Sequence, residues 1–296
     1  VGALEENAVN KRIIAPIVGT MMHKATRWRV VRCVLNVLVW FFWPQMQARF
    51  FGRFRPVVSV DHPLDSEIPF DARYAPLYLS FIDLWMNAAY APLRITRRGT
   101  ARERLIGRRY AADFVDGISD LYVRAGHIYT NTQSTTIRPA ADDWHARFIR
   151  FFDPHLHCVP SLHVWAVVYS WAKTRELVRS VPELSGLADS VDYLRGQAVA
   201  ITDSILFMKQ HSLNCIYTSL HTMTKIYPEF TTEDADAFCL DLLQDPAIDR
   251  RDDMRQVIID GLAAIRKRDA DLGNPDAKEL ILDFLGSYCH QTGSTR

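Results

Sequence analysis

The segment HLHCVPSLHVW, residues 155–165, combines three histidines and a cysteine with a Pro-Ser pair, and an apolar run follows it. Pro160 restricts the residue before it to extended backbone, so the chain is expected to turn here and a helix to begin just after. Ser161 is then the expected N-cap, and His163 falls in the first helical turn. Free N–H groups and a partial positive charge at this end favour an anion such as phosphate. The segment therefore predicts either an anion site or a capped helix whose histidine packs in a core.

Helical periodicity dominates the rest of the chain, which predicts an all-α protein. Strand signals are sparse and short, at residues 57–60 and 127–132, and both also fit loops. Residues 52–73 and 128–142 are expected to be long connections. The expected helices lie at 25–43, 74–91, 100–127, 143–151, 162–180, 185–226 with one break, 232–244, 249–269 and 275–289.

The chain after residue 227 differs in its residue pattern from the part before it. TTEDADAFCLDLL opens with threonine caps and acidic first-turn residues, and Asn274 with Pro275 is the expected start of the last helix. We expect a helical domain at 1–227 and a helical extension at 228–296 that packs on it.

Composition excludes some classes of protein. The 296 residues carry 35 Lys plus Arg against 34 Asp plus Glu, so no global charge draws the chain to nucleic acid or to anionic lipid. The five cysteines are scattered and form no CxxC pair, which argues against a disulfide framework or a thiolate zinc site and favours a reducing compartment.

Two apolar stretches raise the question of a membrane. Residues 33–48 carry no charge but are short and contain Pro44, whereas residues 74–93 are long enough to span but contain Asp83. The helix expected after residue 161 meets Lys173 after a short apolar run. We therefore expect a cytoplasmic or peripheral membrane protein, with an integral membrane protein as the alternative.

Two further segments extend the interpretation of residues 155–165. Arg138 precedes Pro139 in a predicted loop, and a guanidinium can hold two phosphate oxygens at once. Downstream, Ser204 stands seven residues before His211. Taken singly, the arginine fits a surface ion pair and the histidine fits a helix face. Together the three segments form an ordered set: Arg-Pro, then Pro-Ser-x-His, then Ser-x6-His.

This ordered set resembles the type 2 phosphatidic acid phosphatase superfamily, which includes lipid phosphate phosphatases, bacterial acid phosphatases and vanadium haloperoxidases. Its three motifs run Lys-x6-Arg-Pro, Pro-Ser-Gly-His and Ser-Arg-x5-His-x3-Asp. PSLHV followed by KQH is most similar to the inositol phosphorylceramide synthase-like branch, over roughly residues 125–225. The resemblance implies a helical bundle of the phosphatase and haloperoxidase type, with the 228–296 helices added.

The resemblance also implies a mechanism without a metal or cofactor. His211 matches the nucleophile that forms a phosphohistidine, and His163 matches the acid that protonates the leaving oxygen. Arg138 and the N–H groups around Ser161 and Leu162 match the groups that hold the phosphate oxygens. The implied activity is that of a phosphatase or phosphotransferase acting on a phosphate ester, with lipid phosphates in the substrate class and the apolar stretch near 33–50 as a peripheral membrane contact.

Three charged positions of the family motifs are replaced in this chain. Asn131 stands where the first motif has lysine, Ile205 where the third motif has arginine, and Cys215 where it has the aspartate that orients the nucleophile. Lys209 is the expected substitute cation. Asn131 is still counted among the expected phosphate-binding residues. Cys215 and Asn214 are the expected orienting groups, with Asp203 as a further candidate.

These replacements leave other functions open. A degenerate member of the superfamily that binds a phosphorylated ligand or a partner protein is one alternative. A metal-dependent hydrolase is another, in which His155 and His157 join His163 or His211 around zinc, with Asp153 the nearby carboxylate. A nucleophilic Cys158 is the least favoured alternative.

Overall fold

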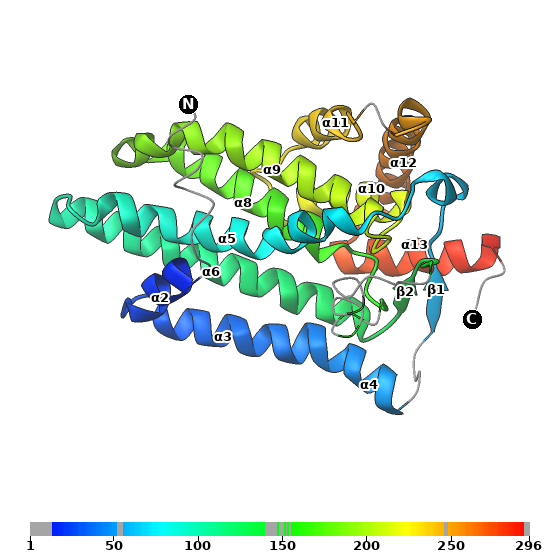
Figure 1. Cartoon of the computed structure of the whole chain (residues 1–296), viewed down its shortest axis with the longest axis horizontal. Helices are drawn as coiled ribbons and strands as arrows, with labels where there is room; N and C mark the ends of the chain where they lie inside the picture. Colours follow the sequence, from blue (N-terminus) through cyan, green and yellow to red (C-terminus); the bar gives the residue numbers. More distant parts are fainter. Residues whose placement is uncertain are drawn as a thin grey trace.

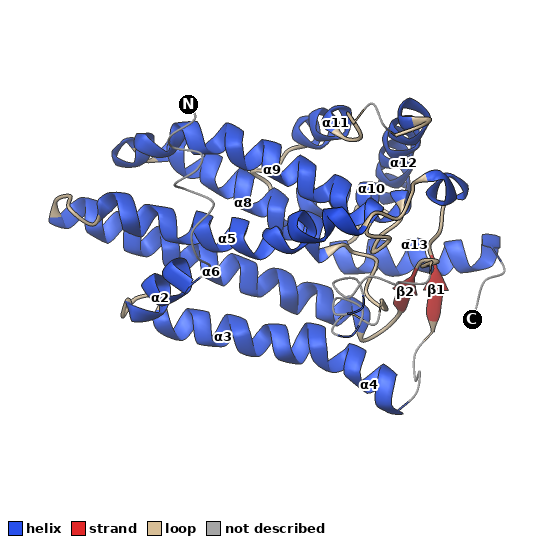
Figure 2. Cartoon of the chain, viewed as in Figure 1, coloured by secondary structure: helices blue, strands red, loops and turns tan. Residues whose placement is uncertain are grey.

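The computed structural model describes residues 14–51, 56–139, 147, 151, 153, 155–245 and 248–292. The side chains of residues 14, 15, 17 and 288–292 are not described. The fold is all-α, as the periodicity predicted, with long helices that run side by side (Figures 1 and 2). The helix expected at 143–151 lies outside the described residues, apart from residues 147 and 151.

The first described helices lie along one edge of the molecule (Figure 1). They are α2 (Ile14–Met22), α3 (Arg27–Val37), a π turn (Leu38–Phe42) and α4 (Trp43–Phe51). The expected end at residue 43 was therefore too early, and the helix continues past Pro44. The π turn directly before this proline shifts the hydrogen-bond register, which accommodates a residue without an N–H group.

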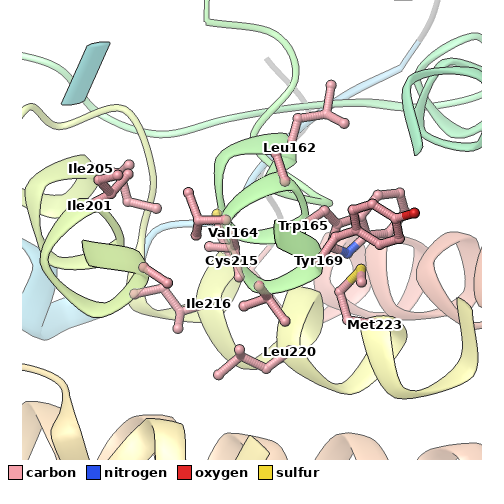
Figure 3. Close-up of a cluster of buried hydrophobic side chains, with 14 of the residues drawn as sticks. Leu162, Val164, Trp165, Tyr169, Ile201, Ile205, Cys215, Ile216, Leu220 and Met223 are labelled. Carbon is pink, nitrogen blue, oxygen red and sulfur yellow. The ribbon is translucent and has the colours of Figure 1, made fainter. Parts of the chain in front are cut away.

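Five longer helices form the body of the fold: α5 (Ala75–Thr96), α6 (Ala101–Tyr129), α8 (Leu162–Ser180), α9 (Ala188–Phe207) and α10 (Leu213–Ile226). α8 is the central one, since it packs against the other four. Figure 3 shows its apolar residues, Trp165 among them, against α9 and α10. The fully buried Trp165 indole donates to the Ser219 carbonyl oxygen at 3.1 Å, so the largest core side chain has its polar atom paired. The predicted break in 185–226 falls between Phe207 and Leu213.

A two-stranded parallel sheet lies beside the bundle, formed by β1 (Val57–Ser59) and β2 (Gln133–Thr135). Residues 127–132, for which both a strand and a loop were open, belong in part to α6, which continues to Tyr129, and β2 begins after them. The segment before α8 also joins this sheet, since the Cys158 N–H donates to the Ser134 carbonyl oxygen at 3.2 Å. The sheet therefore holds the approach to α8 in place.

Three C-terminal helices complete the described chain: α11 (Thr232–Asp241), α12 (Arg251–Asp271) and α13 (Ala277–Thr292). α12 packs on α10, and α13 packs on α6. Thr231 caps α11 as expected, in a capping box with Asp234. The expected start of the last helix at Asn274 was wrong: Asp276 accepts the Glu279 N–H at 2.8 Å and caps α13.

Within the part of the chain that the structure describes, no helix combines the length and the apolar character needed to cross a bilayer.

Candidate active site

The structure brings His163 and His211 together from two different elements. His163 is the second residue of α8, and His211 lies in the turn between α9 and α10. Their ring centroids are 5.6 Å apart with the planes at 70°, and each residue is only 6% exposed. Two imidazoles at this separation can face one phosphate-sized group.

His211 is held by two hydrogen bonds. Its Nδ1 lies 2.9 Å from the Cys158 carbonyl oxygen, and its Nε2 lies 3.2 Å from the Ser161 hydroxyl. A carbonyl oxygen only accepts, so Nδ1 carries the proton and Nε2 keeps its lone pair. Burial lowers the pKa of His211 to about 3, so the ring is neutral near neutral pH. This is the protonation state that a nucleophilic imidazole requires.

His163 sits between two aromatic rings of α5. Its ring centroid lies 4.4 Å from that of Tyr78 and 4.3 Å from that of Phe81. Its Nε2 is buried and has no hydrogen-bond partner among the described residues. Burial, and secondarily His211, place the pKa of His163 well below its ordinary value. A buried polar atom without a partner is costly, and a ligand that bonds to it would remove that cost.

Arg138 and Gln210 add two more unpaired nitrogens next to the histidine pair. Arg138 Nη2 donates to Gln210 Oε1, and Arg138 Nη1 donates to the Asp153 carbonyl oxygen at 3.3 Å. Arg138 Nε and Gln210 Nε2 are buried without a partner in the described chain. Burial lowers the pKa of Arg138, but a guanidinium stays charged in proteins. The site thus contains a cation, and two of its N–H donors have no acceptor among the described residues, as an anion site requires.

The start of α8 contributes fewer donors than expected. Ser161 caps the helix by accepting the Val164 N–H at 3.4 Å, as predicted, but its own N–H donates to Ser219 Oγ at 2.7 Å. The expectation that the Ser161 amide holds a phosphate oxygen was therefore wrong, because that proton is already used. The amides of Leu162 and His163, at the first two helical positions, have no acceptor within the helix.

A cavity of about 660 Å³ opens beside His211. Thr136, Pro139 and Lys209 also line it, together with Asp61 and Asp65. Lys209 Nζ donates to the Asp65 carbonyl oxygen, and burial lowers the pKa of the lysine. Burial raises the pKa of Asp65 to about 6. Lys209, the expected substitute cation, thus lines the same cavity as His211, but its ammonium group is already hydrogen-bonded to the wall of that cavity.

Asn131 lies outside the site. It is exposed, and its Nδ2 donates to the His127 carbonyl oxygen at 2.7 Å, at the end of α6. The prediction that it replaces a phosphate-binding lysine was therefore wrong, since the amide closes the last turn of a helix.

The expected orienting groups also have other partners. Cys215 Sγ accepts the Ser212 N–H at 3.4 Å, and Asn214 Nδ2 donates to the Val60 carbonyl oxygen at 3.0 Å. Asp203 accepts the Leu243 N–H at 3.1 Å. The assignment of Cys215 and Asn214 as orienting residues is corrected: His211 precedes α10 instead of lying on it, so helical i,i+4 geometry does not apply.

His155 and His157 take structural positions. His155 Nε2 accepts the Thr136 N–H at 3.2 Å, and the His157 ring stacks on Tyr129 with centroids 3.9 Å apart. Burial raises the pKa of Cys158 well above its ordinary value. Within the described residues, no group of three His, Cys, Asp or Glu side chains is placed to hold a metal ion.

Two functional groups escaped the sequence analysis. The Cys158 carbonyl that fixes His211 leaves no trace in a sequence, because every residue has such an oxygen. Gln210 did leave a signal, since a polar residue directly before a candidate nucleophile is placed to contact the same ligand.

No family model, curated protein or solved structure matches this chain. The geometry of the site and the three motifs are therefore the basis for a functional proposal.

Proposed function

We propose that this chain is a metal-independent phosphatase or phosphotransferase that acts on a phosphate ester through a phosphohistidine at His211. The observation that supports this proposal most strongly is the pairing of His211, whose Nε2 is unprotonated, with His163 beside a buried guanidinium. The proposal includes the bundle type of the phosphatidic acid phosphatase superfamily. Lipid phosphates belong to the proposed substrate class, and the cytoplasm or a membrane surface is the proposed location.

In the proposed first step, His211 Nε2 attacks phosphorus while the bond from phosphorus to the ester oxygen breaks. The Ser161 hydroxyl now near Nε2 must turn away to admit the phosphoryl group. The Cys158 carbonyl oxygen keeps the Nδ1 proton in place and stabilises the positive charge that develops on the ring. Water, or a second alcohol, then takes the phosphoryl group from Nε2 and restores the neutral histidine.

His163 is the proposed acid for the leaving oxygen. In the empty site this ring is neutral near pH 7, because burial lowers its pKa. A phosphate dianion next to the ring raises that pKa, and a monoanionic ester brings the required proton with it. After the first step His163 is neutral and can take a proton from the incoming water.

Arg138, Gln210 and the first amides of α8 are the proposed ligands of the non-bridging oxygens. Their unpaired nitrogens supply positive charge and N–H donors that are fixed before the substrate arrives. Fixed donors in a site with little water are the main source of rate enhancement in phosphoryl transfer.

A second candidate function is the binding of a phosphorylated ligand without turnover. The position of Asn131 outside the site favours this binding function, because α6 then supplies nothing in place of the lysine of the first motif. The neutral state of His163 favours it as well. Both candidates require the same anion site.

The test is turnover of para-nitrophenyl phosphate and of short-chain phosphatidic acid by purified protein in EDTA. We expect turnover that disappears in His211→Ala and persists in the control His127→Ala, whose ring packs against Trp40. Vanadate binding without turnover would select the binding function. Activity that EDTA abolishes, or absence of both turnover and vanadate binding, would overturn the proposal.

A further inference from the structure

α3, the π turn that follows it and α4 carry a long row of exposed apolar and aromatic side chains. Their exposed fractions lie between 51% for Val39 and 75% for Trp28. We refer to this surface as the α3–α4 face, and it comprises Trp28, Leu35, Val39, Trp43, Phe50 and Phe51. Exposed apolar surface of this extent on one element usually marks an interaction site.

The opposite side of the same helices packs against the bundle. Val30 and Cys33 are buried, and Asn36 Nδ2 donates to Ser119 Oγ of α6 at 2.8 Å. Further along, the Trp40 ring packs against His127 with centroids 4.4 Å apart. α3 is thus fixed on α6 by its inner side. α3 and α4 lie at the edge of the molecule (Figure 1), and the side chains of the α3–α4 face are exposed there.

The charge of this segment is of one sign. Residues 14–51 contain no Asp or Glu, and their basic residues are Lys24, Arg27, Arg29, Arg32 and Arg49. Arg29 and Arg32 share one acidic partner, Asp116 of α6, so the segment and this partner together still carry a positive charge. A second copy of the chain in a two-fold symmetric contact would bring these positive charges against one another. The charge therefore opposes self-association through this face and favours an anionic partner.

A basic cavity adjoins the start of this segment. It measures about 560 Å³ and lies between α2, the end of α5 and the start of α6. The exposed apolar residues Val18 and Met22 line it, together with Arg97, Arg104 and Arg108. Guanidinium groups beside exposed apolar side chains suit a phosphate group attached to a hydrocarbon body.

We propose that the α3–α4 face and this basic cavity form a docking surface for an anionic lipid bilayer. α3 and α4 lie in the plane of the interface, with their apolar side chains among the acyl chains and the arginines on the headgroup phosphates. Trp28 to Phe51 would span roughly 35 Å as a continuous helix, long enough to lie flat along a membrane surface. The inference deepens the membrane location proposed above, because it names the surface that meets the bilayer and the lipid charge that this surface requires. It does not depend on the enzymatic activity.

The test is co-sedimentation of the full chain with phosphatidylcholine vesicles, with and without phosphatidylglycerol. We expect binding only when phosphatidylglycerol is present, and its loss at high salt. Leu35→Glu combined with Val39→Glu should lower the bound fraction by about tenfold or more. The matched control is Leu240→Glu on α11, an equally exposed leucine at 59%, which should bind as the wild type does.

A second variant tests the basic cavity separately. Arg97→Gln combined with Arg108→Gln should weaken binding to phosphatidylglycerol vesicles without altering the circular dichroism spectrum. Equal binding to neutral and anionic vesicles would overturn the charge argument. Lack of binding to any vesicle would overturn the docking surface. This would hold even if the basic cavity bound free inorganic phosphate. It would also hold if the α3–α4 face formed dimers that Leu35→Glu abolishes.

Discussion

The Nδ1 atom of His211 lies 2.9 Å from the carbonyl oxygen of Cys158. This contact fixes the tautomer of the imidazole with a main-chain group where the family motif would use a carboxylate. A carbonyl oxygen cannot be removed by substitution of a side chain. The orientation of the proposed nucleophile therefore does not depend on the residue at position 215.

Cys215→Ala should leave turnover within about twofold of the wild type, because the thiol contacts Ser212 and not His211. It should lower the free energy of unfolding by about 1 kcal/mol, since the Ser212 N–H loses its acceptor. Cys215→Asp, which the family motif favours, should not raise activity, because its carboxylate would occupy a fully buried position. Steady-state kinetics and denaturant unfolding measure both effects. A gain of activity in Cys215→Asp would show that the carbonyl alone does not orient His211.

His163→Asn should slow the hydrolysis of esters according to their leaving groups. If His163 protonates the leaving oxygen, its loss should lower kcat for an alkyl phosphate by about 10²- to 10⁴-fold. The effect on para-nitrophenyl phosphate should be much smaller, because nitrophenolate leaves without a proton. Equal losses on both substrates would instead assign His163 to substrate binding.

The pH dependence of kcat/KM should show an acidic optimum. Burial lowers the pKa of His211 to about 3, so this nucleophile stays unprotonated down to strongly acidic pH. Burial and His211 lower the pKa of His163, so its acidic form becomes scarcer as the pH rises. Above the optimum, kcat/KM should fall by about tenfold per pH unit, and His163→Asn should remove this dependence. A rate that increases from about pH 5 to about pH 8 would contradict these assignments.

The sequence predicted the parts of this structure that depend on local patterns. The bounds of α8 and its Ser161 cap follow from a Pro-Ser pair before an apolar run, and the break before α10 was expected. The order of the motifs also predicted that His163 and His211 lie close together, and their rings are in contact. The helix bounds, the cap and the break depend on periodicity and capping, which adjacent residues encode, whereas the meeting of the two histidines was expected only from the resemblance.

The remaining details of the site depend on tertiary contacts that spacing does not encode. Asn131 and Cys215 were assigned by counting residues from a motif, whereas each side chain bonds to the nearest free partner. The left-handed backbone of Lys209, with φ of 53°, interrupts the helix before His211 and invalidates the helical geometry assumed for Cys215. A turn of this kind has no strong sequence signal when the residue is not glycine.

Gln210→Leu should reduce the free energy of anion binding by more than it reduces the free energy of unfolding. Gln210 Oε1 accepts from Arg138 Nη2, and its own Nε2 has no partner within the described chain. Leucine of similar size removes both the anchor of the guanidinium and one donor to the ligand. Vanadate affinity, measured calorimetrically, should fall by about tenfold or more. Gln197→Leu on α9 is the control, and an unchanged affinity for Gln210→Leu would remove the residue from the site.

Asp203→Asn should become increasingly stabilising relative to the wild type as the pH rises. Burial raises the pKa of this carboxyl to about 7, from 3.8 in the unfolded chain. The folded state thus holds a proton that the unfolded state has released, and the wild type loses stability as the pH rises from about 4 to about 7. The neutral amide does not titrate and can still accept the Leu243 N–H.

The difference in unfolding free energy between Asp203→Asn and the wild type should therefore grow with pH, by up to about 4 kcal/mol across that range. Urea unfolding at several pH values measures it. Asp192→Asn, an exposed position on the same helix, is the matched control. If the Asp203→Asn difference were constant with pH, the Asp203 carboxyl would not be buried as the structure places it.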